Sequence, residues 1–189
     1  GPLFGFVARL DRQKGVDVLA EGAGRIVARG GQIAILGTGA PDLERRVLDL
    51  TKSFRGAVGA LIGYAEPLAR RILAASDFFL MPSLFEPCGL TQMYALRCGT
   101  LPIAHATGGL VDTIADGRTG FLFPEPSARS MGGAVDRAFE AYAEESRLRE
   151  MRRQAAAQAF TWADAAARYV VAYERALARH GDVPTRKAA

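Results

Sequence analysis

The chain has 189 residues, of which 49% are hydrophobic and 23% charged, and its formal net charge is +4 at pH 7. These values are typical of a globular protein whose core needs no disulfides, and they argue against a disordered chain. No apolar run approaches the roughly 18 residues of a membrane-spanning helix. The 24 Lys and Arg residues also lack an aromatic-basic pattern, so we expect a cytoplasmic protein with no membrane or nucleic-acid partner and with small anionic ligands.

Cysteines and histidines are too few to build a disulfide framework or a metal site. The cysteines are Cys88 and Cys98, and the histidines are His105 and His180. None has the neighbouring ligands that a zinc site requires. We therefore expect a reducing compartment and no metal.

Short apolar runs predict six strands, at residues 3–7, 33–36, 58–62, 78–81, 101–104 and 120–123. They lack the strict alternation of a half-exposed sheet, so we expect strands covered on both faces. Apolar residues at helical spacing lie between them, for example over residues 16–27 and 43–53. This alternation predicts an α/β fold, a doubly wound parallel sheet with right-handed crossovers and helices on both faces.

After Pro126 the pattern is helical only, over residues 128–142, 145–159 and 163–179. We expect these helices to pack against the sheet or to reach toward another domain. Residues 182–189 lack apolar periodicity and are expected to form a disordered tail. The domain is therefore predicted to span residues 1–181.

The loop after the first strand carries Arg9 and Lys14. Two cations at a strand end can converge on a diphosphate, Arg through its planar fork and Lys as a point charge. Each charge-assisted hydrogen bond contributes about 1.5–3 kcal/mol. Ordinary loop charge is the alternative, and the position at the ligand-binding edge of an open α/β sheet favours the phosphate.

Gly37 and Gly39 follow the second strand, where glycines let a backbone approach a pyrophosphate. A dinucleotide fingerprint would instead follow the first strand, with a third glycine and an acid about 20 residues further on. A nicotinamide-dependent dehydrogenase is therefore disfavoured. The glycine pair either shapes a ligand pocket or forms a plain turn.

Tyr64 follows the third strand and is a candidate platform for a nucleotide base. An adenine ring can stack on such an exposed aromatic side chain. The alternative is a tyrosine that packs over the next helix, and the sequence leaves both open.

Glu86 lies in a loop that leads into a helical run over residues 90–98. Its carboxylate can accept hydrogen bonds from sugar hydroxyls, while the N–H groups of Gly89, Leu90 and Thr91 can face an anion at a helix start. One loop would then hold a hexose and a diphosphate together. The alternative is an acid that only stabilises the N-terminus of its own helix.

Thr107 and Gly108 begin a second glycine turn, which either offers N–H groups to the same ligand or only tightens the turn. Asp112, which follows, is as readily a first-turn acid as a ligand contact. Cys88 is not expected to be a nucleophile, because no histidine is near it in the sequence. His105 is expected to be a loop or edge residue.

Together, five motifs resemble bacterial glycogen synthase and the related plant starch synthases, in their carboxyl-terminal half. The resemblance runs in order from about residue 3 to residue 178. The motifs are Arg9-Leu10-x-x-Gln13-Lys14-Gly15, Leu36-Gly37-x-Gly39, Gly63-Tyr64-x-Glu66, Pro82-Ser83-x-Phe85-Glu86-Pro87-Cys88-Gly89-Leu90-Thr91-Gln92 and Thr107-Gly108-Gly109-Leu110.

The resemblance implies a Rossmann-like domain, the carboxyl-terminal half of a GT-B glycosyltransferase. That family transfers glucose from ADP-glucose to the nonreducing end of an α-1,4-glucan with retention of configuration, and no cofactor is implied. Arg9 and Lys14 would hold the diphosphate, Tyr64 would stack on adenine, and Glu86 would bind the glucose. Cys88, Gly89, Leu90 and Thr91 would line the glucose and phosphate pocket, with Gly37, Gly39, Thr107 and Gly108 as further substrate contacts.

The resemblance also implies groups that this chain lacks. Many related retaining transferases carry a second glutamate eight positions after the first, where this chain has Tyr94. The glycogen synthase branch also departs from that pattern, so Tyr94 favours this branch and leaves ribose recognition unassigned. The acceptor-binding amino-terminal domain is absent from the chain, so we expect the isolated domain to bind ADP-glucose and to transfer almost no glucose. The alternative is an autonomous nucleotide-sugar binding module without turnover.

Overall fold

The computed structural model describes residues 1–181, and side chains through residue 179. It divides into two compact units, Gly1–Ala157 and a second that begins at Gln158. The first unit ends earlier than the domain boundary expected at residue 181. The predicted tail over residues 182–189 lies outside the described residues.

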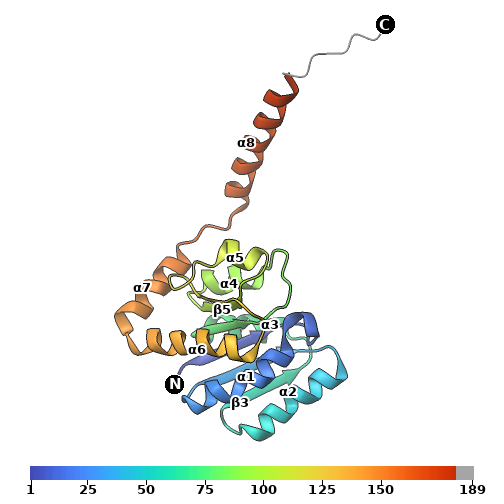
Figure 1. Ribbon diagram of the computed structural model, residues 1–189, viewed down its shortest axis with the longest axis vertical. Helices are drawn as coiled ribbons and strands as arrows, with labels where there is room; N and C mark the ends of the chain where they lie inside the picture. Colours follow the sequence, from blue (N-terminus) through green and yellow to red (C-terminus); the bar gives the residue numbers. More distant parts are fainter. Residues whose placement is uncertain (182–189) are drawn as a thin grey trace. The chain divides into compact units, whose positions relative to one another are not determined.

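The first unit is built on one parallel sheet of six strands, ordered β3-β2-β1-β4-β5-β6 (Figure 1). Its strands are β1 (Leu3–Val7), β2 (Gln32–Gly37), β3 (Val58–Ile62), β4 (Phe78–Met81), β5 (Leu101–His105) and β6 (Phe121–Phe123). Each strand pairs in parallel with its neighbours, and the order reverses between β1 and β4. The predicted doubly wound parallel α/β fold is confirmed.

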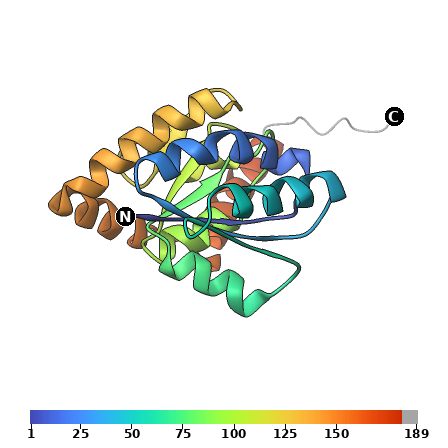
Figure 2. The same ribbon diagram turned by 90° about the horizontal axis from the view of Figure 1, so that it is seen from below.

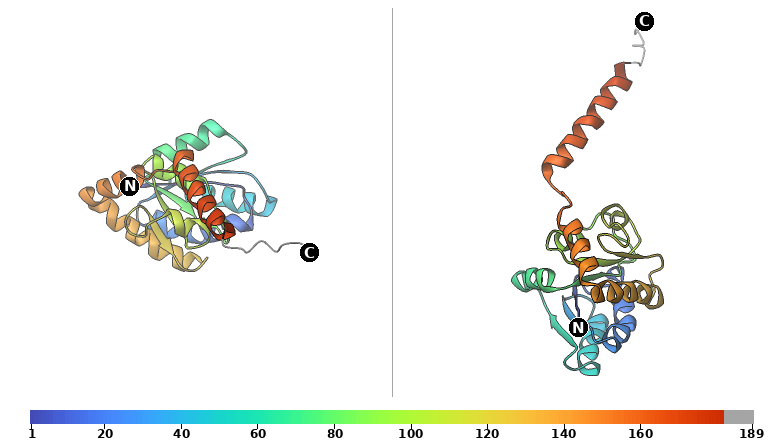
Figure 3. Two further views of the ribbon diagram at one scale, coloured as in Figure 1. Left: turned by 90° about the horizontal axis from the view of Figure 1, so that it is seen from above. Right: turned by 90° about the vertical axis from the view of Figure 1, so that its left-hand side faces the viewer.

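Helices cover both faces of this sheet. They are the 3-10 helix η1 (Arg12–Lys14), α1 (Val16–Ala28), α2 (Pro41–Ser53), α3 (Glu66–Ala75), α4 (Thr91–Arg97), α5 (Gly109–Thr113), α6 (Ala128–Ala143) and α7 (Glu145–Ala156). Figure 2 shows α1, α2 and α6 on one face, with α3 on the other. In the left panel of Figure 3 the sheet again separates α3, in green, from α6, in yellow.

Neighbouring residues of β4 point to opposite faces of the sheet and so build two cores. Phe78 lies on the α6 face, with ring centroids 5.2 Å from Phe4 and 6.4 Å from Tyr142. Phe79 lies on the other face, in a buried cluster with residues from α3, α4 and α5. The middle strands are thus covered on both faces, which explains their continuous apolar sequence.

β3 differs from the prediction that all strands are covered on both faces. It is the edge strand next to β2, its Gly59 is exposed, and its Leu61 is 46% exposed. The apolar run predicted the strand but not its place in the sheet. Helix boundaries also shift by a few residues, since α7 ends at Ala156 rather than at residue 159.

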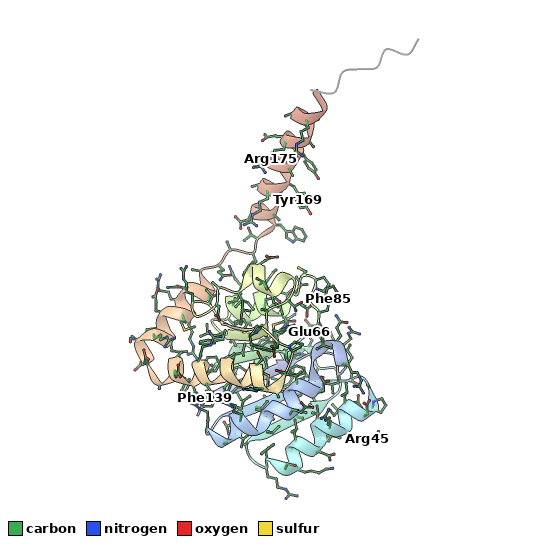
Figure 4. All side chains as sticks on the ribbon, in the orientation of Figure 1. Arg45, Glu66, Phe85, Phe139, Tyr169 and Arg175 are labelled. Carbon is green, nitrogen blue, oxygen red and sulfur yellow. The ribbon has the colours of Figure 1, made fainter. Side chains whose placement is uncertain are left out.

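The second unit contains α8 (Trp162–Gly181). Thr161 caps its start, because the Thr161 hydroxyl accepts a hydrogen bond from the Asp164 N–H at 3.2 Å. Tyr169, labelled in Figure 4, lies on this helix one turn before Tyr173, and their ring centroids are 6.1 Å apart. Among the described residues, no helix is long and apolar enough to cross a membrane.

Gly15 joins η1 to α1 and has a left-handed backbone with φ of 68°. A Cβ there would lie 2.0 Å from the carbonyl oxygen of Pro82, in the loop after β4. Gly15→Ala is therefore expected to lower the free energy of unfolding by about 3 kcal/mol, from backbone strain and steric overlap. Chemical denaturation measures the change.

Gly133 of α6 is the matched control, because an added Cβ there meets nothing within 4 Å. Gly133→Ala should stabilise the protein by about 0.5–1 kcal/mol through helix propensity. Equal effects of the two substitutions would contradict the packing described for Gly15.

An ion-pair cluster links α1 to α6. Arg25 binds both carboxylate oxygens of Asp136, and Arg29 Nη1 lies 2.9 Å from Asp136 Oδ1. Hydrogen bonding from Arg25 is the main cause that lowers the pKa of the Asp136 carboxyl below its ordinary value of 3.8. The cluster therefore stabilises the fold wherever Asp136 is ionised.

Asp136→Asn should lower the free energy of unfolding by about 0.5–1 kcal/mol at pH 7, since the arginines are partly exposed. A lowered folded pKa contributes stability above the unfolded pKa that is lost as pH falls through the folded value. The difference between wild type and variant should thus shrink as the pH falls through the lowered folded-state pKa of Asp136. Denaturation from pH 2 to 7 checks this, and Asp49→Asn, which breaks the exposed Asp49–Lys52 pair, should show a smaller effect.

Candidate nucleotide-sugar site

The reversal of strand order between β1 and β4 decides where a ligand can bind. The loops after these two strands leave the sheet toward opposite faces and open a crevice at its carboxyl edge. The loop after β1 carries Arg9 and Lys14, and the loop after β4 carries Glu86. Two segments about 70 residues apart in sequence therefore meet at one place.

Backbone contacts hold these two loops together. Leu84 N–H donates to the Gln13 carbonyl at 2.8 Å, and the Gln13 side-chain amide donates to the Phe85 carbonyl at 3.2 Å. Gly15 permits the close approach to Pro82 described above. The relative position of the loops is thus determined by several contacts.

Lys14 and Glu86 form an ion pair across the crevice. Lys14 Nζ lies 2.6 Å from Glu86 Oε2, and the two side chains are only 21% and 10% exposed. The buried Ser83 hydroxyl donates a further hydrogen bond to Glu86 Oε2 at 3.3 Å. Lys14 is itself held by Asp11, whose carboxylate accepts from the Lys14 N–H at 2.9 Å.

A cleft of about 410 Å³ opens beside this ion pair. Six of the site residues expected from the sequence line it together: Arg9, Lys14, Glu86, Gly89, Leu90 and Thr91. Cations and helix-start N–H groups suit phosphate oxygens, while the carboxylate suits sugar hydroxyls. The first cleft therefore has the chemistry of a sugar phosphate site.

A second cleft of about 280 Å³ adjoins the first, and Arg9 lines both. Its walls are largely apolar, from β1, β2 and α3, and they include Gly37 and Tyr64. Tyr64 is 87% exposed, so it does not pack over the next helix as one reading allowed. Glu66, at the start of α3, also lines the second cleft. In Figure 4, Glu66 lies on the same side of the first unit as Phe85, the residue that precedes Glu86 in the sequence.

Gly39 serves the turn after β2. Its N–H donates to the Glu44 carboxylate at 2.9 Å, and the Thr38 hydroxyl donates to the same oxygen at 2.8 Å. Both hydrogen bonds lower the pKa of the Glu44 carboxyl below its ordinary value, and the one from Gly39 has the larger effect. Gly37 lines the second cleft, whereas Gly39 is not among the residues lining either cleft.

Thr107 and Gly108 do not line either cleft; their turn lies against the backbone of the Glu86 loop. A Cβ on Gly108 would lie 2.0 Å from the Glu86 carbonyl oxygen, and the Gly109 N–H donates to that oxygen at 3.0 Å. Their place in the structure is support for the loop, and a ligand contact for them stays a prediction. Cys88 is exposed beside the first cleft and does not line it either.

Sequence reasoning gave no role to two residues that hold the site. His105 is the buried last residue of the inner strand β5, and its Nδ1 lies 2.8 Å from the Ser83 carbonyl oxygen, where it supports the Glu86 loop. Ser83 is buried and binds Glu86 directly. In the sequence, the only indication of this contact is that Glu86 follows Ser83 by three positions. Within the described residues no group of three or more His, Cys, Asp or Glu side chains could hold a metal ion.

Comparison with known proteins identifies the family of this chain. The family model "Glycosyl transferases group 1" matches residues 1–141. A glycogen synthase of Xanthomonas campestris pv. campestris (strain 8004) is 52% identical over 98% of this chain, and one of Xanthomonas oryzae pv. oryzae (strain PXO99A) is 53% identical over 94%. The chain spans 39% and 35% of these relatives' lengths.

A solved structure, the catalytic domain of starch synthase IV from Arabidopsis thaliana bound to ADP and acarbose, matches with a TM-score of 0.84. It is 36% identical and is matched over 94% of this chain and 38% of its own. The resemblance to glycogen and starch synthases is thus confirmed, and so is the Rossmann-like, GT-B type of fold. This chain belongs to the group 1 glycosyl transferases, with glycogen synthases among its relatives.

Proposed function

We propose that this chain is the ADP-glucose binding domain of a retaining glucosyltransferase that extends the nonreducing end of an α-1,4-glucan. The observation that carries the proposal is the pair of adjoining clefts, one polar and charged and one largely apolar, joined at Arg9. A nucleoside diphosphate sugar has the same two parts. The similar starch synthase structure holds ADP, which supports the choice of nucleotide.

In the first cleft, Arg9 and Lys14 would bind the diphosphate and stabilise the charge that develops on it as the glucose leaves. Preorganised cations and N–H groups in a partly buried cleft stabilise such charge without further reorganisation. Glu86 would accept hydrogen bonds from glucose hydroxyls. Its pairing with Lys14 at 2.6 Å brings the sugar contact and the phosphate contact side by side.

In the second cleft, Tyr64 would stack on the adenine and Gly37 would let the base lie close to the backbone. A Cβ on Gly37 would lie 2.1 Å from the Ala8 carbonyl oxygen, so only glycine fits between β1 and β2 there. Arg9 would then bind the phosphate between base and sugar. No metal or cofactor is required by this arrangement.

The acceptor glucan would be bound mainly by a further domain, since the chain spans about two fifths of its glycogen synthase relatives. We therefore expect the 189-residue chain to bind ADP and ADP-glucose and to transfer almost no glucose to glycogen. A cytoplasmic location fits this substrate. Efficient glucan extension by the chain alone, assayed with labelled ADP-glucose, would show that the catalytic groups are misassigned.

Lys14→Met tests the phosphate part of the site. Loss of a partly buried charge-assisted contact should weaken ADP binding about ten-fold or more and leave adenosine binding unchanged. Calorimetry measures both affinities, with Lys52→Met, an exposed lysine on α2, as the control. Tighter binding of NAD or UDP than of ADP by the wild-type chain would overturn the proposed substrate.

Tyr64→Ala tests the base part of the site. Aromatic stacking contributes about 1–3 kcal/mol per base, so ADP and adenosine should both bind about 5- to 150-fold more weakly. Pyrophosphate affinity should not change, because Tyr64 does not line the first cleft. Leu61→Ala, an exposed apolar residue on β3, is the control. Unchanged adenosine affinity in Tyr64→Ala would place the base elsewhere.

A further inference from the structure

Gln92 is a fully buried polar residue at the start of α4 that the proposed mechanism does not use. Its Nε2 donates to the carbonyl oxygens of Cys88 and Gly89, at 2.9 and 3.0 Å. It also lies 3.2 Å from Thr113 Oγ1, whose hydroxyl donates to the Gly109 carbonyl at 2.7 Å. Gln92 therefore ties the loop after β4 to α5.

The direction of the Gln92 amide follows from its partners. Carbonyl oxygens only accept hydrogen bonds, so the nitrogen of the amide must face Cys88 and Gly89. Gln92 Oε1 is buried and has no hydrogen-bond partner among the described residues. A buried acceptor without a partner is unfavourable. This cost indicates that the hydrogen bonds of the Gln92 N–H₂ group matter more at this site than a partner for Oε1.

Gly89 is required by the same contact. Its backbone is left-handed, with φ of 71°, and a Cβ there would lie 2.4 Å from Gln92 Oε1. The side chain of Gln92 thus lies directly against the Gly89 backbone. Any larger residue at position 89 would push the two apart.

Peptide geometry links this contact to the first cleft. In a trans peptide the C=O and the following N–H point in opposite directions. The Cys88 carbonyl shares a peptide with the Gly89 N–H, and the Gly89 carbonyl shares one with the Leu90 N–H. Because Gln92 holds both carbonyls toward itself, both N–H groups point away from Gln92. Gly89 and Leu90 are among the residues that line the first cleft.

We infer that Gln92 is a positioning residue: it holds the Cys88 and Gly89 carbonyls away from the first cleft, so that the Gly89 and Leu90 N–H groups bind the diphosphate. The inference rests on the proposed function, because it assigns these N–H groups to the phosphate. Without Gln92 either peptide plane could rotate. A carbonyl oxygen would then face the anion and repel it.

Gln92→Met keeps the length and volume of the side chain and removes its N–H donors. ADP should bind at least about ten-fold more weakly, the equivalent of one lost charge-assisted hydrogen bond. Adenosine, which uses the second cleft, should bind within about two-fold of wild type. Gln92→Glu should weaken ADP binding further, because its carboxylate would face two carbonyl oxygens. Calorimetry and competition titrations measure these affinities on the 189-residue chain.

Arg97→Met, an exposed substitution on the same helix, is the control and should leave both affinities unchanged. An ADP affinity of Gln92→Met within two-fold of wild type, or an equal loss for ADP and adenosine, would overturn the positioning role. If Gln92 only stabilised the fold, its replacement would weaken the binding of ADP and adenosine equally.

Ligand-free crystal structures of wild type and Gln92→Met test the orientation of the Cys88 and Gly89 peptides without any ADP measurement. We expect at least one of the Cys88 and Gly89 carbonyls to turn away from residue 92 in the variant, and unchanged peptide planes would overturn the inference. If the wild-type chain bound no ADP, the proposed function would fail, while this comparison would still test what Gln92 holds.

Discussion

Lys14 and Glu86 are 72 residues apart in sequence, and their ion pair depends on the reversal of strand order between β1 and β4. β1 and β4 are neighbours in the sheet, so the loops after them leave the same edge. The pair is largely shielded from water, which strengthens the attraction and makes the loss of either partner costly. Contacts of Gln13 and Gly15 keep these two loops together, and Ser83 binds Glu86 within the loop after β4.

Around this pair the backbone is held by residues that do not line the clefts. His105 lies against the Ser83 carbonyl, and the Gly109 N–H donates to the Glu86 carbonyl. The Gln92 amide donates to the carbonyls of Cys88 and Gly89. Four carbonyl oxygens of the loop after β4 are thus held by residues that do not line the clefts. An anion in the first cleft meets cations and N–H groups instead, as binding of a diphosphate requires.

The predicted strands and crossover helices were confirmed because apolar periodicity is a local property of the sequence. The same reasoning was wrong that β3 is covered on both faces, since an edge strand and a central strand can carry the same short apolar run. It could not choose between a turn and a ligand contact for Gly39 or Gly108 either. Both choices depend on a group that folding brings close, the Glu44 side-chain carboxylate for Gly39 and the Glu86 backbone carbonyl for Gly108.

The sequence by itself determined the α/β class, the helix and strand positions and the family, because each follows from residue spacing or from ordered motifs. It also identified Arg9, Lys14, Tyr64 and Glu86 as candidates. Only the tertiary structure decided that they border two adjoining clefts, and that Ser83, His105 and Gln92 hold the loop beside them. These contacts join segments that are far apart or within a single loop, and no periodicity along the chain encodes them.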